Sequence, residues 1–183
     1  MAAPWGQGIA KKFASSKFWP KKWKMINKNG WLTEAEIIPS SNFDHRPENT
    51  KVKLIVIHNI SLPPENFESE NIKKLFTNQL DFDSHEYFKE IKDLKVSSHF
   101  LLDRRGKIFQ FVSVFERAWH AGISSFNNEE NCNDYSLGIE LIGSDTTKFS
   151  KDQYDSLKWL INTLKSFFPE IRQNQYQFQV MTW

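Results

Sequence analysis

The chain has 183 residues and a mass of 21.6 kDa, and 39% of its residues are hydrophobic and 15% aromatic. This length suits a single compact domain, and the composition can supply a buried core, which excludes wholesale disorder. No apolar run approaches the roughly 18 residues that a membrane-spanning helix needs, and the single Cys, Cys132, excludes an internal disulfide framework and favours a reducing compartment.

The 24 basic and 22 acidic side chains are unevenly distributed. Seven Lys and no Asp or Glu lie in residues 1–29, so the rest of the chain carries 17 basic against 22 acidic side chains, a net charge of −5. This acidity argues against a nucleic-acid-binding domain. The leader could be an arm that binds a membrane or a nucleic acid, a targeting peptide, or a solvated segment outside the mature protein. Because blocks of like charge usually stay solvated, we expect residues 1–24 to be disordered or not translated.

The first half of the chain predicts one strand followed by short helices. Residues 31–41 indicate an irregular lead-in, and residues 53–57 (Lys-Leu-Ile-Val-Ile) predict a short buried strand that ends at His58. Residues 65–92 then follow a mostly helical pattern, broken into pieces.

The second half predicts a hairpin, a strand and a long helix. Residues 97–103 and 107–112 predict two strands joined by a tight turn, and residues 119–133 indicate a polar loop. Residues 136–142 predict another apolar strand, and residues 150–168 predict the clearest helix, with a serine cap before it and a proline after it. Strands mixed with helices predict an α/β fold in which helices flank a central sheet.

Four side chains at or near predicted strand ends could carry chemistry: His58, His99, His120 and Glu140. Ligands of α/β proteins gather outside strand ends. Glu140 lies between two apolar residues, where a carboxylate is costly unless it is paired, bound to a metal or raised in pKa, as a general base requires. Together the four suggest a hydrolytic zinc site, although neither HExxH nor CxxC spacing is present.

Each of these residues also has a structural interpretation. A single His at a strand end, such as His58, is more often hydrogen-bonded than a ligand, and His99 could be a core histidine bonded to a backbone carbonyl. His120 could pack against its neighbour Trp119, and Glu140 could form an ion pair with a Lys or Arg. Residue types and spacing alone leave these alternatives open.

Short motifs around these residues, in order along the chain, resemble those of a known enzyme family. They are Gly30-Trp31-Leu32, Pro39-Ser40, Asp44-x-Arg46-Pro47, Val56-x-His58-Asn59-Ile60-Ser61-Leu62-Pro63-Pro64, Val96-Ser97-x-His99, Arg117-Ala118-Trp119-His120-Ala121-Gly122 and Cys132-Asn133-Asp134-x-Ser136-x-Gly138-Ile139-Glu140-Leu141. The chain resembles the AmpD-type anhydro-N-acetylmuramoyl-L-alanine amidases, of the zinc amidase family that includes peptidoglycan-recognition proteins and phage T7-type lysozyme. The resemblance covers residues 25–175 and implies that family's α/β fold, a mixed central β-sheet flanked by helices.

The resemblance implies a zinc-dependent hydrolase, an N-acetylmuramoyl-L-alanine amidase. It would cut the amide between the lactyl group of muramic acid and L-alanine in anhydro-muropeptides recovered from the cell wall. It implies His58 as the first ligand of Zn²⁺ and Glu140 as the acid/base that activates the metal-bound water. His99 matches a family histidine that is not a ligand.

The resemblance also implies which residues meet the substrate. Asn59, Trp119 and His120 would line the cleft, and Lys95 is a candidate for binding a substrate carboxylate, where the family often uses Arg. We expect a monomeric protein of the bacterial cytoplasm, with an anhydro-muropeptide as its partner and neither nucleic acid nor membrane. The alternative class is a non-catalytic protein that binds peptidoglycan fragments.

Two departures from the family pattern divide the chain into three predicted segments. We expect a leader at residues 1–24, which an over-long gene start would explain, an amidase domain at residues 25–175 and a non-family tail at residues 176–183. The family places its other two zinc ligands, a His and an Asp, after the last helix, and this sequence has neither there. We therefore expect a C-terminally truncated amidase fold, produced by a true truncation or by a frameshift, with weak zinc binding and poor hydrolysis.

Overall fold

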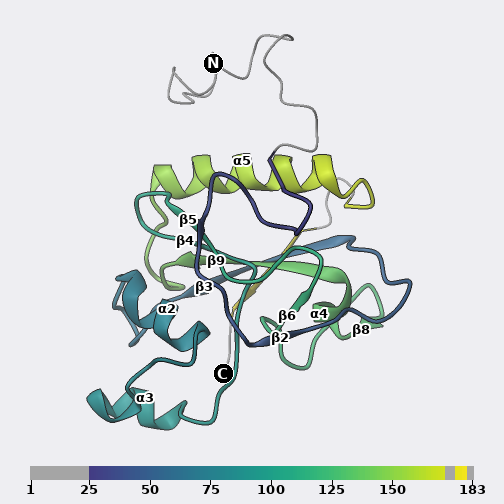
Figure 1. Cartoon of the computed structure of the whole chain (residues 1–183). Helices are drawn as coiled ribbons and strands as arrows, with labels where there is room; N and C mark the ends of the chain where they lie inside the picture. The colour runs from purple at the N-terminus through teal and green to yellow at the C-terminus, as the bar shows by residue number, and fades with distance from the viewer. Residues whose placement is uncertain (1–24, 172–175, 181–183) are drawn as a thin grey trace.

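A computed structural model describes residues 25–171 and the backbone of residues 176–180. At its centre lies a six-stranded sheet with the strand order β1-β5-β4-β9-β3-β10. Figure 1 labels its inner strands β3, β4, β5 and β9. All neighbouring strands pair in parallel except β4 and β5, which form the antiparallel hairpin predicted from the sequence. The mixed central sheet that we expected is therefore confirmed. In the order of the sheet, its strands are β1 (Glu36–Ile37), β5 (Ile108–Gln110), β4 (Phe100–Leu102), β9 (Ser136–Ile142), β3 (Leu54–Ile60) and β10 (Tyr176–Val180).

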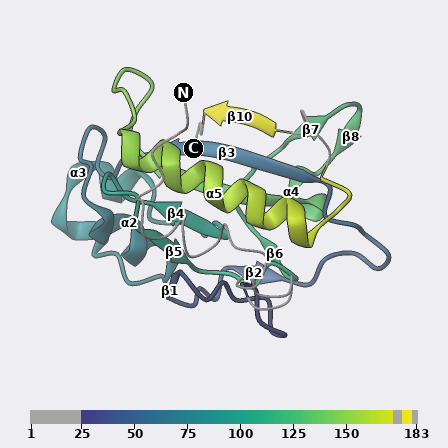
Figure 2. The ribbon, with the colours of Figure 1, turned by 90° about the horizontal axis from the view of Figure 1, so that it is seen from above.

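Helix α5 (Lys151–Phe167) covers one face of this sheet, as Figures 1 and 2 show. Its buried leucines pack against alternate residues of the central strands, among them Ile57 and Ile139. The helix begins where the sequence predicted, because Ser150 accepts a hydrogen bond from the backbone N–H of Gln153 and the side chain of Gln153 accepts one from the backbone N–H of Ser150.

Shorter elements cover the opposite face. Helices α2 (Ser69–Phe76) and α3 (Glu86–Glu90), with a 3₁₀ turn at Phe82–Ser84 between them, confirm the helical segment in pieces. Their apolar side chains pack with Leu101 and Ile142, which point away from α5. The core therefore consists of two layers, one on each side of the sheet.

Two short antiparallel strand pairs and a short helix complete the side of the sheet opposite α5. Strand β2 (Phe43–Asp44) pairs with β6 (Arg117–Ala118) in an antiparallel ladder. The segment predicted as a polar loop, residues 119–133, contains a hairpin of β7 (Ser125–Phe126) and β8 (Glu129–Glu130) and the start of the short helix α4 (Cys132–Tyr135). Two-residue strands of this kind carry too little periodicity to be recognised in a sequence.

Strand β3 is longer than predicted. We expected it to end at His58, but Asn59 and Ile60 also pair with β9, opposite Leu141 and Ile142. His58 therefore lies inside the strand instead of at its end, and its backbone is held on both sides.

Strand β10 was not predicted. It lies in the segment that we assigned to a non-family tail, and it pairs in parallel with β3 from Tyr176 opposite Ile55 to Val180 opposite Asn59. The expected leader, residues 1–24, lies outside the described residues, so the segment boundaries stay predictions. Among the described helices, none combines the length and apolar character required to span a bilayer.

Candidate active site

The strand pairing brings together the two residues to which the motif resemblance assigned the chemistry. His58 of β3 and Glu140 of β9 are register partners in a parallel ladder. Register partners on neighbouring strands point to the same side of a sheet, here the side opposite α5. Both side chains are buried, with 2% of His58 and none of Glu140 exposed.

Glu140 has an unusual environment for a carboxyl group. It is fully buried, and neither of its side-chain oxygens has a hydrogen-bond partner among the described residues. Burial raises the pKa of Glu140 well above its usual value, because the charged form loses its hydration. A carboxyl group whose proton affinity is raised by burial is typical of a general acid/base.

The imidazole of His58 contacts His120, and His58 is among the residues that line a pocket. Its Nε2 lies 3.0 Å from Nδ1 of His120, and the two ring planes are inclined by 65°. The pocket has a volume of about 390 Å³. It is lined by Ile57, His58, Asn59, Ser144, Asp145, Thr146, Thr147, Lys148, Phe149 and Tyr154.

Asn59, a predicted substrate residue, lines this pocket beside His58. Its side-chain amide donates a hydrogen bond of 2.7 Å to the carboxylate of Asp145. The loop that carries Asp145 and Lys148 was not singled out from the sequence. Its position directly after strand β9 is the signal that could have identified it, because ligand-binding loops follow strand ends in α/β proteins.

His120, the second predicted substrate residue, lies behind His58. It is 1% exposed, and its ring packs on Gly138, where a Cβ would come within 2.4 Å of the imidazole Cγ. Its Nδ1 faces His58, and its Nε2 lies 3.1 Å from Oγ of Ser136. The structure thus places His120 as a buried support of His58.

His99 is fully buried on the same side of the sheet and takes no part in the pocket. Its Nδ1 accepts a hydrogen bond from the backbone N–H of Gly138, and its Nε2 lies 3.1 Å from the carbonyl oxygen of Glu116. Burial, with the nearby charge of Arg46, lowers the pKa of His99 to about 3. These contacts match the structural interpretation of a core histidine.

Trp119 and Lys95, the remaining predicted substrate residues, are not among the described residues that line the pocket. Trp119 is half-buried, and its backbone exchanges hydrogen bonds with Ser97. Lys95 is exposed on the segment that leads into β4.

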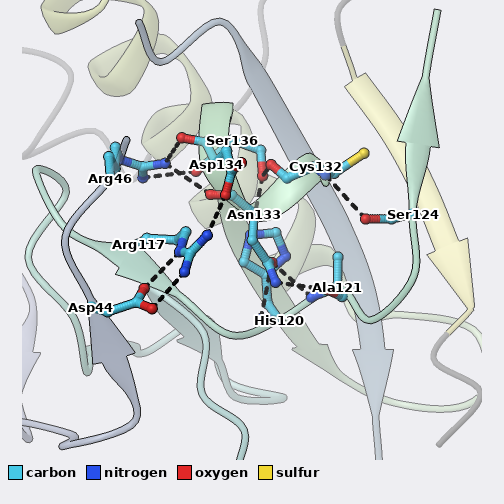
Figure 3. A network of polar contacts seen from close by, with 10 residues as sticks. All are labelled: Asp44, Arg46, Arg117, His120, Ala121, Ser124, Cys132, Asn133, Asp134 and Ser136. Atoms are coloured by element: carbon cyan, nitrogen blue, oxygen red, sulfur yellow. Dashed lines mark hydrogen bonds and ion pairs between the residues drawn. The ribbon is translucent and has the colours of Figure 1, made fainter. Parts of the chain in front are cut away.

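A polar network holds the loop that carries His120 (Figure 3). Arg117 lies between the carboxylates of Asp44 and Asp134, with contacts of 2.5 Å to each. Hydrogen bonds from Arg117 lower the pKa of Asp44. Asn133 accepts hydrogen bonds from the backbone N–H groups of His120 and Ala121 and donates one to the carbonyl oxygen of Ala121.

The described residues do not complete a metal site. A catalytic zinc normally takes three protein ligands. Among residues 25–171 no group of three His, Cys, Asp or Glu side chains could share a metal ion. Residues 172–183 contain none of these residue types. His58 is therefore a single candidate ligand.

Comparisons with known proteins agree on one family. Residues 48–178 match the family model described as N-acetylmuramoyl-L-alanine amidase. The chain is 46% identical over 150 residues to the 1,6-anhydro-N-acetylmuramyl-L-alanine amidase AmpD of Salmonella typhimurium strain SL1344, across 82% of this chain and 80% of that protein. It is 44% identical over 155 residues to AmpD of Haemophilus influenzae, across 85% and 84% of the two chains. A crystal structure of a selenomethionine derivative of AmpD superposes with a TM-score of 0.80 and 44% identity, across 84% of this chain and 86% of that one.

Proposed function

Because the chain belongs to the N-acetylmuramoyl-L-alanine amidase family, we propose that it hydrolyses the amide bond between 1,6-anhydro-N-acetylmuramic acid and L-alanine in muropeptides. The reaction belongs to the recycling of peptidoglycan. Beyond the similarity itself, one structural observation supports this proposal. His58 and Glu140 are register partners on one face of the sheet, and the Glu140 carboxyl is buried with its proton affinity raised.

We propose Glu140 as the acid/base of the reaction. As a carboxylate it takes a proton from the water that attacks the amide carbonyl, and as a carboxylic acid it returns that proton to the nitrogen of the departing alanine. The raised pKa of Glu140 strengthens its carboxylate as a base, and the proton it takes up is then available for the leaving nitrogen. For this role the amide must enter beside His58, the member of the pair that lines the pocket.

We propose that three of the predicted substrate residues contact the muropeptide. Asn59 lines the pocket next to His58 and is placed to contact the substrate near the amide bond. The half-buried Trp119 and the exposed Lys95 would contact parts of the substrate further away, with the ammonium group of Lys95 against a carboxylate. The fully buried position of His120 favours a different role.

Zn²⁺ is the cofactor that family membership implies, and we propose His58 as one of its ligands. When bound, zinc lowers the pKa of a coordinated water and polarises a carbonyl group. The described residues offer fewer than the three ligands that such a site needs, so no step of the mechanism is assigned to the metal.

We further propose the bacterial cytoplasm as the place of the reaction and a monomer as the acting unit. Anhydro-muropeptides are the products of cell-wall turnover that a recycling enzyme would receive. The net negative charge of residues 30–183 fits neither a nucleic acid nor an anionic membrane as a partner.

A hydrolysis assay tests the amidase proposal. The chain is incubated with anhydro-N-acetylmuramoyl tripeptide and added Zn²⁺, and the released peptide is measured by mass spectrometry beside the variant Glu140→Gln. We expect release that falls by about 100-fold or more in the variant, the usual contribution of a general acid/base. Equal rates for both proteins would contradict the role of Glu140.

The incomplete set of ligands favours a second candidate function, a protein that binds peptidoglycan fragments without cleaving them. Calorimetric titration with the same muropeptide separates the two candidates. Binding without any hydrolysis by the unaltered chain would support the binding protein, and turnover that depends on Glu140 would support the amidase.

A further inference from the structure

Each hydrogen bond around His120 has one donor and one acceptor, and the chemistry of the partners decides which is which. The hydroxyl group of Ser136 lies 2.5 Å from the carbonyl oxygen of Cys132, which can only accept. Ser136 therefore uses its single proton on that carbonyl. Towards Nε2 of His120, at 3.1 Å, the same hydroxyl oxygen can only accept, so Nε2 of His120 carries a proton.

The next step of the chain reaches His58. The ring of His120 is 1% exposed, and its two nitrogens face the imidazole of His58 and the hydroxyl of Ser136, so a charged ring would have no carboxylate against either nitrogen and the neutral ring is favoured. A neutral imidazole with its proton on Nε2 has a lone pair on Nδ1. Because Nδ1 of His120 lies 3.0 Å from Nε2 of His58, the proton between them belongs to His58. His58 is then fixed as the Nε2–H tautomer.

We infer that His120 is a positioning residue that fixes the tautomer and the ring orientation of His58 through a chain of hydrogen bonds from Ser136. This inference rests on the proposed function, because it assigns a role at the same site. In a neutral histidine the hydrogen bond at one ring nitrogen decides which atom the other nitrogen presents. With its Nε2–H directed at His120, His58 presents the lone pair of Nδ1 from the ring edge turned away from His120.

The surroundings of His120 are built to keep its ring in place. Asn133 holds the backbone of His120 and Ala121, as Figure 3 shows. Arg46 donates hydrogen bonds to the carbonyl oxygens of Asp134 and Ser136 and so fixes the start of β9. Gly138 supplies the space beneath the ring, because any Cβ there would overlap the imidazole.

Two variants of similar size separate the two hydrogen bonds of His120. In His120→Asn the amide oxygen takes the place of Nδ1 and can still accept from His58, while the contact with Ser136 is lost. In His120→Gln the amide nitrogen takes the place of Nε2 and can still donate to Ser136, while the acceptor for His58 is lost. A general disturbance of the core would change the His58 tautomer and kcat equally in both variants. The proposed role predicts a larger change in His120→Gln.

The test is the tautomer of His58, read from ¹⁵N NMR of the imidazole rings in the full chain without added metal. We expect the Nε2–H tautomer in the unaltered chain and in His120→Asn, and a mixture of tautomers in His120→Gln. Ser136→Ala provides a second route, since His120 is then free to move its proton to Nδ1 and disturb His58. An Nδ1–H tautomer of His58 in the unaltered chain would overturn the inference, as would identical His58 spectra in all four proteins.

Kinetics provide a second test, because a purely structural role of His120 would lower kcat equally in both variants. We expect kcat for the muropeptide to fall by about 100-fold in His120→Gln, the effect of a misplaced reacting group, with KM changed little and with part of kcat recovered in His120→Asn. Equal losses of kcat in the two variants would count against the positioning role. If no variant and no unaltered chain hydrolyses the substrate, the proposed function fails, and the NMR result still decides the tautomer.

Discussion

At the scale of single residues, the carboxyl group of Glu140 has the largest consequence for how the molecule responds to pH. Its pKa is raised in the folded state by burial, whereas an unfolded chain has a Glu pKa of about 4.3. Between these two values the folded state holds a proton that the unfolded state has lost. The free energy of unfolding contributed by Glu140 is therefore fully present below about pH 4.3 and declines as the pH rises through that window.

We predict that Glu140→Gln is more stable than the unaltered chain at pH 8 and that this difference shrinks towards pH 4.5. The variant has no ionisable group at this position, so it avoids the cost of a buried charge, which changes by at most about 1.4 kcal/mol per pH unit. Urea unfolding at several pH values measures the difference. Glu90→Gln, at an exposed position, is the matched control, and a difference for Glu140→Gln that does not vary with pH would contradict the prediction.

Gly138 has a second residue-scale consequence, because its missing side chain leaves room for His120. We predict that Gly138→Ala lowers the free energy of unfolding by about 1–3 kcal/mol, as added volume in a packed core does, since the new Cβ would lie 2.4 Å from the His120 ring. Thermal unfolding of the variant measures this loss. Gly122→Ala is the control, because nothing lies within 4 Å of a Cβ there, and equal losses in both variants would refute the argument.

The candidate site could be predicted from the sequence only in part. The positions of His58 and Glu140 on buried strands could be predicted, because a run of apolar residues indicates a buried strand. The hydrogen bond from His58 to His120 could not be predicted, since His120 lies 62 residues from His58 along the chain and 16 from Ser136. Such contacts arise only when the sheet is assembled, and a lone buried histidine gives no sign of which nitrogen it uses.

At the scale of secondary structure, helix α5 shows how residues close together in the sequence determine where a helix begins. Its start was predicted from Ser150 as the capping residue, and in the structure Ser150 and Gln153 form a capping box. Strand β3 shows the opposite case. Its polar residues His58 and Asn59 suggested an end, and pairing with β9 carries the strand on to Ile60. Strand β10 alternates Tyr, Gln, Phe, Gln and Val, a pattern typical of strands, although none of the motifs that carry the family resemblance lies in this segment.

We predict that Ser150→Ala lowers the free energy of unfolding by about 1 kcal/mol, the usual loss for an N-cap serine. The variant also loses the hydrogen bond that the Ser150 hydroxyl donates to the carbonyl oxygen of Arg104. Urea unfolding measures the change. Ser166→Ala, at an exposed position inside the same helix, serves as the control, and a loss of the same size there would assign the effect to helix propensity instead of the cap.

At the scale of the whole molecule, the fold class followed from the order of strands and helices, and the comparisons confirm the family. The strand order of the sheet did not follow, because it depends on which strands meet across long connections. Strands β3 and β9 are neighbours although about 75 residues separate them in the chain. That pairing, and nothing local, puts His58 beside Glu140.

We predict that zinc stabilises the 183-residue chain very little. A complete site filled at 100 times its dissociation constant adds about 2.7 kcal/mol, which raises the Tm of a protein of this size by roughly 5–10 °C. Because the described residues offer no group of three ligands, we expect the Tm with Zn²⁺ and with a chelator to agree within about 2 °C. Calorimetry on the two samples measures the shift. Stoichiometric zinc after dialysis, with a large rise in Tm, would contradict the prediction.

The position of β10 affects how the molecule avoids self-association. This strand pairs along β3 on the side away from β9, and Figure 2 shows it at the border of the sheet. Strand β10 pairs with the backbone N–H and C=O groups along one side of β3. A border strand leaves such groups open to pairing with a strand of another chain. With β10 in place, the apolar strand that contains His58 is shielded from such intermolecular pairing. Removal of residues 176–180 would uncover it and invite strand exchange between copies.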